Sequence, residues 1–506
     1  MEPAPIGEAR ESGNVKLNLS VKPNPMELAL IGEARESGNV ELNMKLDFIN
    51  SDFLLGSPQA KTLFHRFAED APVVDFHNHL VVSDMVEDRN FGDIGELWVC
   101  QDKYKHRAMR MAGIDERFIS GDASSFEKFS AWCELFPKMI GNPLFHWSCL
   151  EMKRVFGVDE LPCAGNAEQI WDHCNGLLSG SGWSTNSILH RFHVSRLSTS
   201  DDWTDDISLH VKASKVSGIK VSPSLRADAA VAFGSPSFMK FLERLPGGGV
   251  DSIEDYCSIL RSCLDRFVGS GCVLADHALD NGFAFIETGQ ERASSLFGRL
   301  LGGEELSGGE LVELRSYMLV FLAREYAQRG WTMQLHIGAE RWTSSRLRQA
   351  AGPAGGYACP GNTVNLRALC DFLDALDRDA LLPKTVLYTL NPADNAVLST
   401  LTGSFGLDRV QKLQFGPAWW YNDHKHGIEE NLAALSSYSI LANSIGMTTD
   451  SRTILSFSRH EYFRRVLCNY LGEMMKNGEL PDDTEFVGRT VLDISYRNAE
   501  KWIYNE

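Results

Sequence analysis

The sequence lacks long apolar runs and an excess of basic charge. No run approaches the ~18 apolar residues of a membrane span, and the first residues show no cationic segment followed by an apolar core. We therefore expect neither membrane insertion nor secretion. The 67 acidic residues outnumber the 49 basic ones and give a net charge of −18, which argues against general binding to nucleic acid or to anionic membranes.

Paired cysteine motifs and nucleotide-binding glycine loops are also missing. The eleven cysteines are scattered, odd in number and include no Cys-x-x-Cys. This pattern is typical of reduced thiols and predicts a cytoplasmic protein, not a disulfide framework or a zinc ribbon. No Gly-x-Gly-x-x-Gly follows an expected strand, so no nucleotide cofactor is expected. The 506 residues allow one large domain with insertions, or two to three domains.

A tandem duplication occupies the N-terminus. Residues 6–15 recur unchanged at 31–40. Two copies are too few to stack into a stable repeat array. We therefore assign residues 1–50 to a poorly ordered extension, of which 1–45 should be dispensable, and residues 51–506 to the folded domain. The alternative interpretation is a regulatory or partner-binding pair of strands.

The stretch 73–79 organises the rest of the chain. Two valines lead into an alternating segment that predicts a short buried strand ending in His77 and His79. Residues two apart on a strand point to the same side, so both imidazoles can face one point. Neutral imidazole is the commonest side-chain ligand for zinc. Taken alone, the pattern fits a structural role equally well.

Apolar runs that alternate with amphipathic segments predict the fold class. The expected strands are 73–77, 194–199, 219–222, 272–276, 332–337, 385–390, 410–415 and 446–449. Eight strand–helix units favour an α/β fold of the closed (β/α)8 TIM barrel type over an open doubly wound sheet. The gap from His79 to Val194 is far longer than a normal βα connection. We therefore expect a helical subdomain, approximately residues 84–190, inserted after the first strand.

Polar residues follow every expected strand, at the barrel face that carries the chemistry of such folds. They include His77, His79, Asp202, Arg226, Asp276, His277, His336, Asp394, Trp419, Asp450 and Arg452. Each alone has a structural alternative, such as a helix cap for Asp394. In a closed barrel the eighth strand pairs with the first. His77, His79 and Asp450 are therefore expected to meet as a mixed nitrogen and oxygen metal site.

His-x-His on the first strand with an aspartate on the eighth resembles the amidohydrolase superfamily. Longer motifs resemble one of its branches, uronate isomerase, also called glucuronate isomerase, from Asp52 to the C-terminus. These motifs include residues 104–110, 121–124, 141–147, 276–280, 330–339, 390–392, 414–423, 449–452 and 459–465. The resemblance implies a (β/α)8 barrel of the metal-dependent hydrolase type.

The activity implied by the resemblance is aldose–ketose isomerisation of small uronates. D-glucuronate would be interconverted with D-fructuronate, and D-galacturonate with D-tagaturonate, through an enediol. One divalent ion, with Zn²⁺ the expected identity, would be held by His77, His79 and Asp450, and would orient and polarise the sugar. The catalytic candidates, among which the sequence does not assign the C2 base, are Asp450, Tyr104, His277 and His336. The substrate-binding candidates are Arg226, Arg452, Arg341, Trp419 and Lys103.

The chain departs from the family before Tyr104, where the family typically has histidine and this chain has Lys103. With an ordinary pKa near ~10.4, a lysine is a poor neutral acceptor. Two alternatives therefore stay open: a metal-dependent hydrolase on the same scaffold, and a non-catalytic relative weakened at Lys103. Whether the protein forms a homo-oligomer is also left open.

Overall fold

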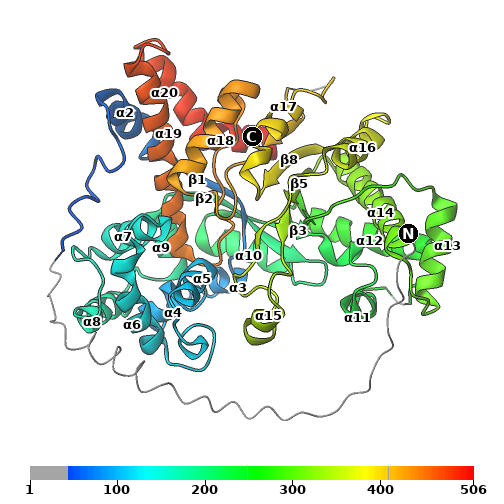
Figure 1. The fold of residues 1–506 in the computed structure, drawn as a ribbon, viewed down its shortest axis with the longest axis horizontal. Coiled ribbons are helices and arrows are strands. Elements are labelled where there is room, and N and C mark those ends of the chain that lie inside the picture. Colours follow the sequence, from blue (N-terminus) through cyan, green and yellow to red (C-terminus); the bar gives the residue numbers. More distant parts are fainter. Residues whose placement is uncertain (1–43, 248, 408–409, 506) are drawn as a thin grey trace, which may run out of the picture. The chain divides into compact units, whose positions relative to one another are not determined.

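A curved parallel sheet forms the centre of the fold (Figure 1). The computed structural model describes residues 44–247, 249–407 and 410–505, so the duplicated segments 6–15 and 31–40 lie outside the described residues. Seven strands lie in the order β1 (Val73–Asn78), β2 (Val194–Asp202), β3 (Lys220–Arg226), β4 (Leu274–Leu279), β5 (Thr332–Ile337), β8 (Lys384–Thr389) and β9 (Leu413–Phe415). All paired neighbours in this sheet are parallel.

The prediction of an eighth strand at residues 446–449 was wrong. Residues 446–449 do not form a strand, so the described sheet has seven strands, not eight. The segment still runs beside β1, because the Asp450 N–H donates to the His77 carbonyl (2.9 Å) and the His79 N–H donates to the Ser451 carbonyl (2.8 Å). Asp450 has a φ of 47°, in the left-handed region, which is incompatible with a regular strand.

Seven α-helices lie between β1 and β2, where the sequence predicted helices. They are α3 (Val82–Val86), α4 (Ile94–Trp98), α5 (Lys103–Met111), α6 (Ser125–Leu135), α7 (Pro143–Phe156), α8 (Ala167–Leu178) and α9 (Thr185–Arg191). Local signals fix their ends: Ser124 and Glu127 form a capping box at α6, and Gly157 ends α7 in the left-handed conformation. These helices share one hydrophobic core with α2 (Pro58–Leu63) and α19 (Ser458–Lys476).

A second group of helices packs on the outer face of the sheet, apart from the first group (Figure 1). Its members are α11 (Pro236–Arg244), α12 (Ile253–Gly269), α13 (Gln290–Leu301), α14 (Gly308–Arg329), α16 (Leu366–Asp377) and α17 (Asn395–Leu401). Helix α18 (Lys425–Tyr438) contributes to both cores, and α10 (Ser208–Ser217) packs against α3 in the first core. The connection from β5 to β8 carries a small antiparallel pair, β6 (Ala339–Glu340) and β7 (Cys359–Pro360), and α15 (Ser345–Ala351). No described helix combines the length and apolarity needed to span a membrane.

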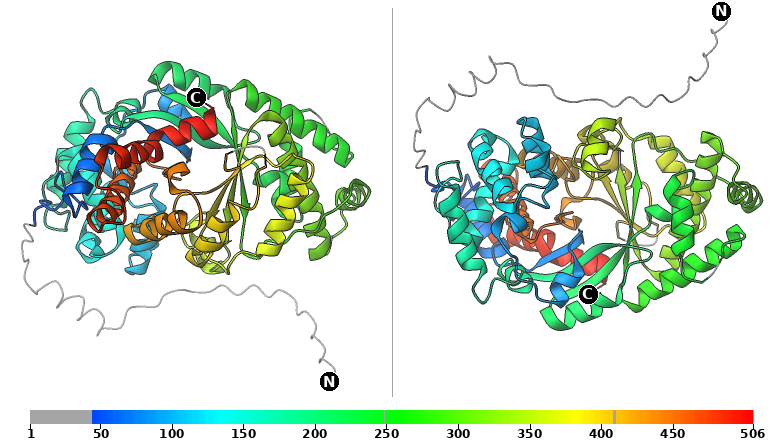
Figure 2. Two further views of the ribbon diagram at one scale, coloured as in Figure 1. Left: turned by 90° about the horizontal axis from the view of Figure 1, so that it is seen from above. Right: turned by 90° about the horizontal axis from the view of Figure 1, so that it is seen from below.

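The last helices, α20 (Thr484–Leu492) and α21 (Asn498–Tyr504), bring the end of the chain back to the sheet (Figure 2). Ile503 of α21 is fully buried in a cluster with Val74 and Phe76 of β1. The Lys384 ammonium, at the start of β8, donates to the carbonyls of Trp502 (2.7 Å) and Ile503 (3.1 Å). The C-terminal helix therefore packs against the amino-terminal part of the sheet.

The N-terminal part of the described chain is packed before residue 50. Leu46 and Ile49 are fully buried in the core shared with the α3–α9 region, and the Leu46 N–H donates to the Asp159 carbonyl (2.8 Å). The domain boundary at residue 50 stays a prediction, but these contacts move the first useful truncation point to residue 43.

We expect a chain lacking residues 1–43 to keep the unfolding temperature and activity of the full chain. A chain lacking residues 1–50 should unfold at a lower temperature, because Leu46 and Ile49 each contribute roughly 1.5–3 kcal/mol of burial. Differential scanning calorimetry of both truncations checks this prediction. Insoluble or inactive protein from the shorter truncation would show that the duplicated segment is needed.

Candidate active site

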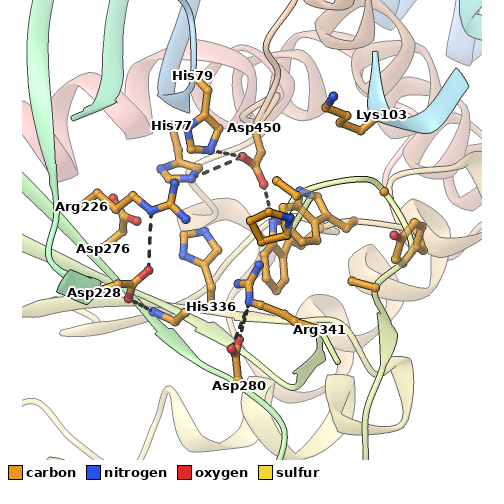
Figure 3. A pocket seen from close by; sticks show the side chains of 18 of the residues that line it. His77, His79, Lys103, Arg226, Asp228, Asp276, Asp280, His336, Arg341 and Asp450 are labelled. Atoms are coloured by element: carbon orange, nitrogen blue, oxygen red, sulfur yellow. Dashed lines mark hydrogen bonds and ion pairs between the residues drawn. The ribbon is translucent and has the colours of Figure 1, made fainter. Parts of the chain in front are cut away.

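A cavity of about 850 Å³ lies where the strands end (Figure 3). The residues that line it come from β1, β3, β4 and β5, from the segments after β9 and before α19, and from α5 in the helical region. Ten of the eleven residues that the sequence proposed for the site line this cavity, and so does one further residue of the strand-end set. These are His77, His79, Lys103, Tyr104, Arg226, His336, Arg341, Trp419, Asp450 and Arg452, together with Asp276 of the strand-end set.

The group His77, His79 and Asp450 meets as predicted. The Asp450 Oδ1 lies 2.9 Å from His79 Nε2 and 3.5 Å from His77 Nε2. Although burial opposes ionisation, the two imidazoles hold the pKa of the Asp450 carboxyl well below its ordinary value. The approach of these atoms lacks hydrogen-bond geometry at Asp450 Oδ1, and His77 Nδ1 is also buried without a hydrogen-bond partner. Donor atoms that converge in this way suit a shared divalent cation.

His336 stands beside this group. Its ring lies 4.7 Å from those of His77, Tyr388 and Trp419, measured between centroids. Burial holds the pKa of His336 well below its ordinary value, so the imidazole is neutral, and its buried Nε2 has no hydrogen-bond partner. The Trp419 indole N–H donates to Asp450 Oδ2 (2.7 Å) and fixes that carboxylate. His336 therefore presents a neutral nitrogen, and Trp419 orients Asp450.

β4 contributes Asp276 to the cavity, whereas His277 points the other way. The His277 Nε2 lies 3.1 Å from the Tyr326 hydroxyl on α14, and His277 is not among the described residues that line the cavity. Successive side chains of a strand face opposite sides, so only one of two neighbours can reach the site. Burial raises the pKa of Asp276 to about 7 and lowers that of His277 to about 4. The apolar Ala275 and Leu279, two positions from His277, were the sequence signal for this orientation.

Because His277 packs against α14, we expect His277→Gln to lower the unfolding temperature and to reduce kcat less than His336→Gln does. The loss of a buried hydrogen bond of this kind costs about 1 kcal/mol. Steady-state kinetics and thermal unfolding of the two variants check this prediction. A larger kcat loss in His277→Gln would return His277 to the catalytic group.

Cationic side chains lie on two sides of the cavity (Figure 3). Arg226, at the end of β3, approaches Asp228 at 3.6 Å, and Arg341 is already bound to Asp280 at 2.8 Å. Lys103 begins α5 and is half-buried. Burial, and then the neighbouring Arg452 guanidinium, lower the pKa of Lys103. Lys103, Arg226, Arg341 and Arg452 therefore all line the cavity, and Arg341 is paired with Asp280.

Tyr104 reaches the cavity from the first turn of α5. Its hydroxyl donates to the carboxylate of Asp423 (3.2 Å to each oxygen), and Asp423 in turn binds Arg459 at 2.7 Å. Burial raises the pKa of Tyr104 well above its ordinary value, so the phenol is neutral. Asp423 and Arg459 fall within the sequence motifs 414–423 and 459–465, but their roles were not predicted. Their spacing in the sequence does not show that they meet Tyr104.

Together, the curled parallel sheet and the histidine–aspartate group at its carboxyl end define an α/β protein, and its fold is similar to that of a putative metal-dependent hydrolase from Lactobacillus casei (TM-score 0.52, 13% identity). Within this class, the chain belongs to the glucuronate isomerase family, whose model matches residues 44–503. The resemblance stated from the sequence is thereby confirmed.

The relatives match over nearly their whole length. The uronate isomerase of Bacillus licheniformis is 41% identical over 464 residues, which cover 91% of this chain and 98% of that protein. The uronate isomerase of Caldanaerobacter subterraneus is 39% identical over 462 residues, which cover 90% and 99%. The crystal structure of uronate isomerase from Thermotoga maritima superposes with a TM-score of 0.85 at 31% identity, covering 90% of this chain and 99% of that one.

Proposed function

We propose that this chain is a uronate isomerase that interconverts D-glucuronate with D-fructuronate, and D-galacturonate with D-tagaturonate. The observation that carries the proposal is the family match over residues 44–503, with the predicted His77, His79 and Asp450 converging at one cavity. A hydrolase on the same scaffold has no observation in its favour.

His77, His79 and Asp450 would hold one divalent ion, and Zn²⁺ suits two neutral imidazoles and a carboxylate. The buried Asp450 Oδ1, which has no hydrogen-bond partner and meets the Nε2 atoms of both histidines, supports this assignment. When bound, such an ion supplies polarisation of sugar oxygens. A second group, His77, Asp276 and His336, also has converging donor atoms. Metal analysis of variants of both groups would identify the ion and its full set of ligands.

The uronate carboxylate would bind on the cationic side of the cavity. Arg452 lies two residues after Asp450, and Lys103 of α5 lines the same cavity. A planar guanidinium can hold a carboxylate through two parallel hydrogen bonds. Arg226 is the second candidate for this role. Arg341 is held by Asp280 and would contact sugar hydroxyls, with Trp419 beside them.

Isomerisation moves a proton between C2 and C1 and places charge on the sugar oxygens, so it needs a base and hydrogen-bond donors. Asp450 is ionised, which fits it to accept a proton. Tyr104 is a neutral phenol and His336 a neutral imidazole, and we assign them to hydrogen bonds with the oxygens that develop charge. Asp276, with a pKa of about 7, is a further candidate for proton exchange.

We extend the proposal to the architecture. Residues 446–451 would take the place of the eighth strand of a (β/α)8 barrel, since they bind β1 through the backbones of Asp450 and Ser451. The helices between β1 and β2 would then be a subdomain inserted at approximately residues 84–190. The cysteines, all free among the described residues, fit a cytoplasmic enzyme.

A coupled assay that follows ketose formation from D-glucuronate, and then from D-galacturonate, tests the proposed activity. We expect turnover of one or both, and its loss after chelation of the metal. Purified, metal-loaded protein that isomerises neither uronate would contradict the proposal, and hydrolytic turnover in its place would establish the hydrolase alternative.

Lys103→His, which restores the residue usual in the family, should leave this turnover similar or raise it. Lys103 is half-buried at the cavity, and its pKa is lowered, so a neutral imidazole can replace it without losing an ion pair. Steady-state kinetics with both uronates measure the effect. An inactive natural sequence that Lys103→His rescues would show that this chain has lost catalysis at that position.

A further inference from the structure

Two consecutive buried side chains at the start of α19 lie close to the metal-ligand candidates: Arg459 binds the segment that carries Asp450, and His460 binds Asp75 of β1. The Thr449 peptide groups are held from both sides. The Thr449 N–H donates to Asp75 Oδ2 (2.9 Å), and the Thr449 carbonyl accepts from Arg459 Nη2 (2.8 Å). Side chains therefore bind both peptide groups of Thr449, immediately before Asp450. In a strand, these groups would instead form backbone hydrogen bonds with neighbouring strands.

Asp75 is the centre of these contacts. It is fully buried on β1, two residues before His77. Its carboxylate lies 2.9 Å from His460 Nε2 and 3.0 Å from the Thr448 hydroxyl. That hydroxyl in turn accepts from the His77 N–H (2.8 Å). One carboxylate thus joins β1, the segment 448–450 and α19.

Arg459 extends the same set of contacts to the other side of the cavity. Its Nη1 binds Asp423 Oδ2 at 2.7 Å, and Asp423 accepts from the Tyr104 hydroxyl. Arg459 is buried, so this hydrogen bonding takes place away from bulk water. A single guanidinium therefore connects the Thr449 backbone with Tyr104.

The conformation of Asp450 explains why the segment needs such bonds. With a φ of 47°, Asp450 is in a region that aspartate seldom occupies, and such residues persist when their surroundings over-determine them. From these contacts we infer that Arg459, His460 and Asp75 form a positioning latch that sets Asp450 opposite His77 and His79. The inference rests on the proposed role of His77, His79 and Asp450 as metal ligands.

Substitution of His460 tests the latch. His460→Gln removes the imidazole bonded to Asp75, and we expect the Zn²⁺ dissociation constant of the metal-free protein to rise about 10–100-fold, as for other outer partners of metal ligands. Hydrogen exchange of residues 446–452 should also become faster. His210→Gln is the matched control, because His210 is likewise buried and binds Asp201 at 3.1 Å on another part of the sheet. The control should change neither measurement.

Substitution of Arg459 tests the second arm. Arg459→Lys keeps the charge but cannot bind Thr449 and Asp423 with one planar group, so it should weaken Zn²⁺ binding and lower kcat together. The matched control is Arg465→Lys, on the same helix, where a buried guanidinium binds the carbonyls of Ser51 (2.8 Å) and Phe53 (3.0 Å). If His460→Gln does not fold, Thr448→Val removes one hydroxyl of the latch with little change of shape and replaces it in the test.

Three results would overturn the latch: unchanged Zn²⁺ affinity and exchange in His460→Gln or Thr448→Val, equal losses of affinity in the test and control variants, or a natural sequence that binds no Zn²⁺. Failure of the proposed activity would appear differently. A protein that binds Zn²⁺ and loses affinity only in the latch variants, but isomerises neither uronate, would retain the latch and contradict the isomerase assignment.

Discussion

His77→Ala should yield a protein with little bound metal, and its kcat/KM for D-glucuronate should fall by more than about a hundredfold. Loss of an outer partner of a metal ligand already costs about 10–100-fold, and His77 is proposed as a ligand itself. The substitution also removes one of the two imidazoles that keep the buried Asp450 carboxyl ionised. Metal analysis of the purified variant, together with steady-state kinetics, measures both effects.

His210→Ala provides the control for this experiment. His210 is as buried as His77 and also lies beside an aspartate, but it is on α10, away from the cavity lining. It should lower the unfolding temperature and leave the metal content unchanged. Full metal occupancy in His77→Ala would show that the ion is not held by the group His77, His79 and Asp450.

Arg452→Lys should lower kcat/KM by about ten- to a hundredfold, although the positive charge is kept. A charge-assisted contact with a carboxylate is worth roughly 1.5–3 kcal/mol, and lysine cannot reproduce the two parallel bonds of a guanidinium. Arg452 lines the cavity two residues after Asp450, where the side chain can reach a substrate carboxylate. The comparison of kcat with KM shows whether the loss falls on binding or on turnover.

Arg226→Lys decides between the two guanidinium groups. If Arg452→Lys keeps full activity while Arg226→Lys loses it, the carboxylate binds at the end of β3. Arg315→Lys is the neutral comparison, because Arg315 also lines the cavity but donates to the carbonyls of Val231 and Phe233. It should change kcat/KM little.

The sequence was sufficient for the parts of the fold that follow from local patterns. The run 332–337 coincides with β5, and strands are also present near 194, 220, 274 and 385, where the sequence predicted them. Of these, β5 and β8 are buried along their whole length. The segment 446–449 was also predicted as a strand, but Thr449 is bonded to the side chains of Asp75 and Arg459, and the Thr448 hydroxyl to the His77 carbonyl of β1. Composition alone cannot distinguish a regular strand from a segment that is held mainly by side-chain hydrogen bonds.

The same limit applies to the site. His77, His79 and Asp450 were predicted to meet because the eighth strand of a closed barrel pairs with the first, and the structure brings them together although residues 446–449 form no strand. The choice between Asp276 and His277 required the strand's alternation, which the neighbouring apolar residues did indicate. The contact of His460 with Asp75 joins positions 385 residues apart, and no local pattern carries such information.

The contact of α21 with the sheet has a consequence for biosynthesis. Val74 and Phe76 leave the ribosome long before their apolar partner Ile503 is translated. Until then β1 carries uncovered apolar surface beneath His77, and the contacts between β1 and the 448–450 segment also wait for late residues. A truncated mRNA that ends shortly before codon 498 would therefore encode a chain without α21, and this chain should have no enzymatic activity. The product would be a nascent chain recognised by chaperones and proteases, and a tag fused directly after Tyr504 would slow maturation more than one fused at the N-terminus.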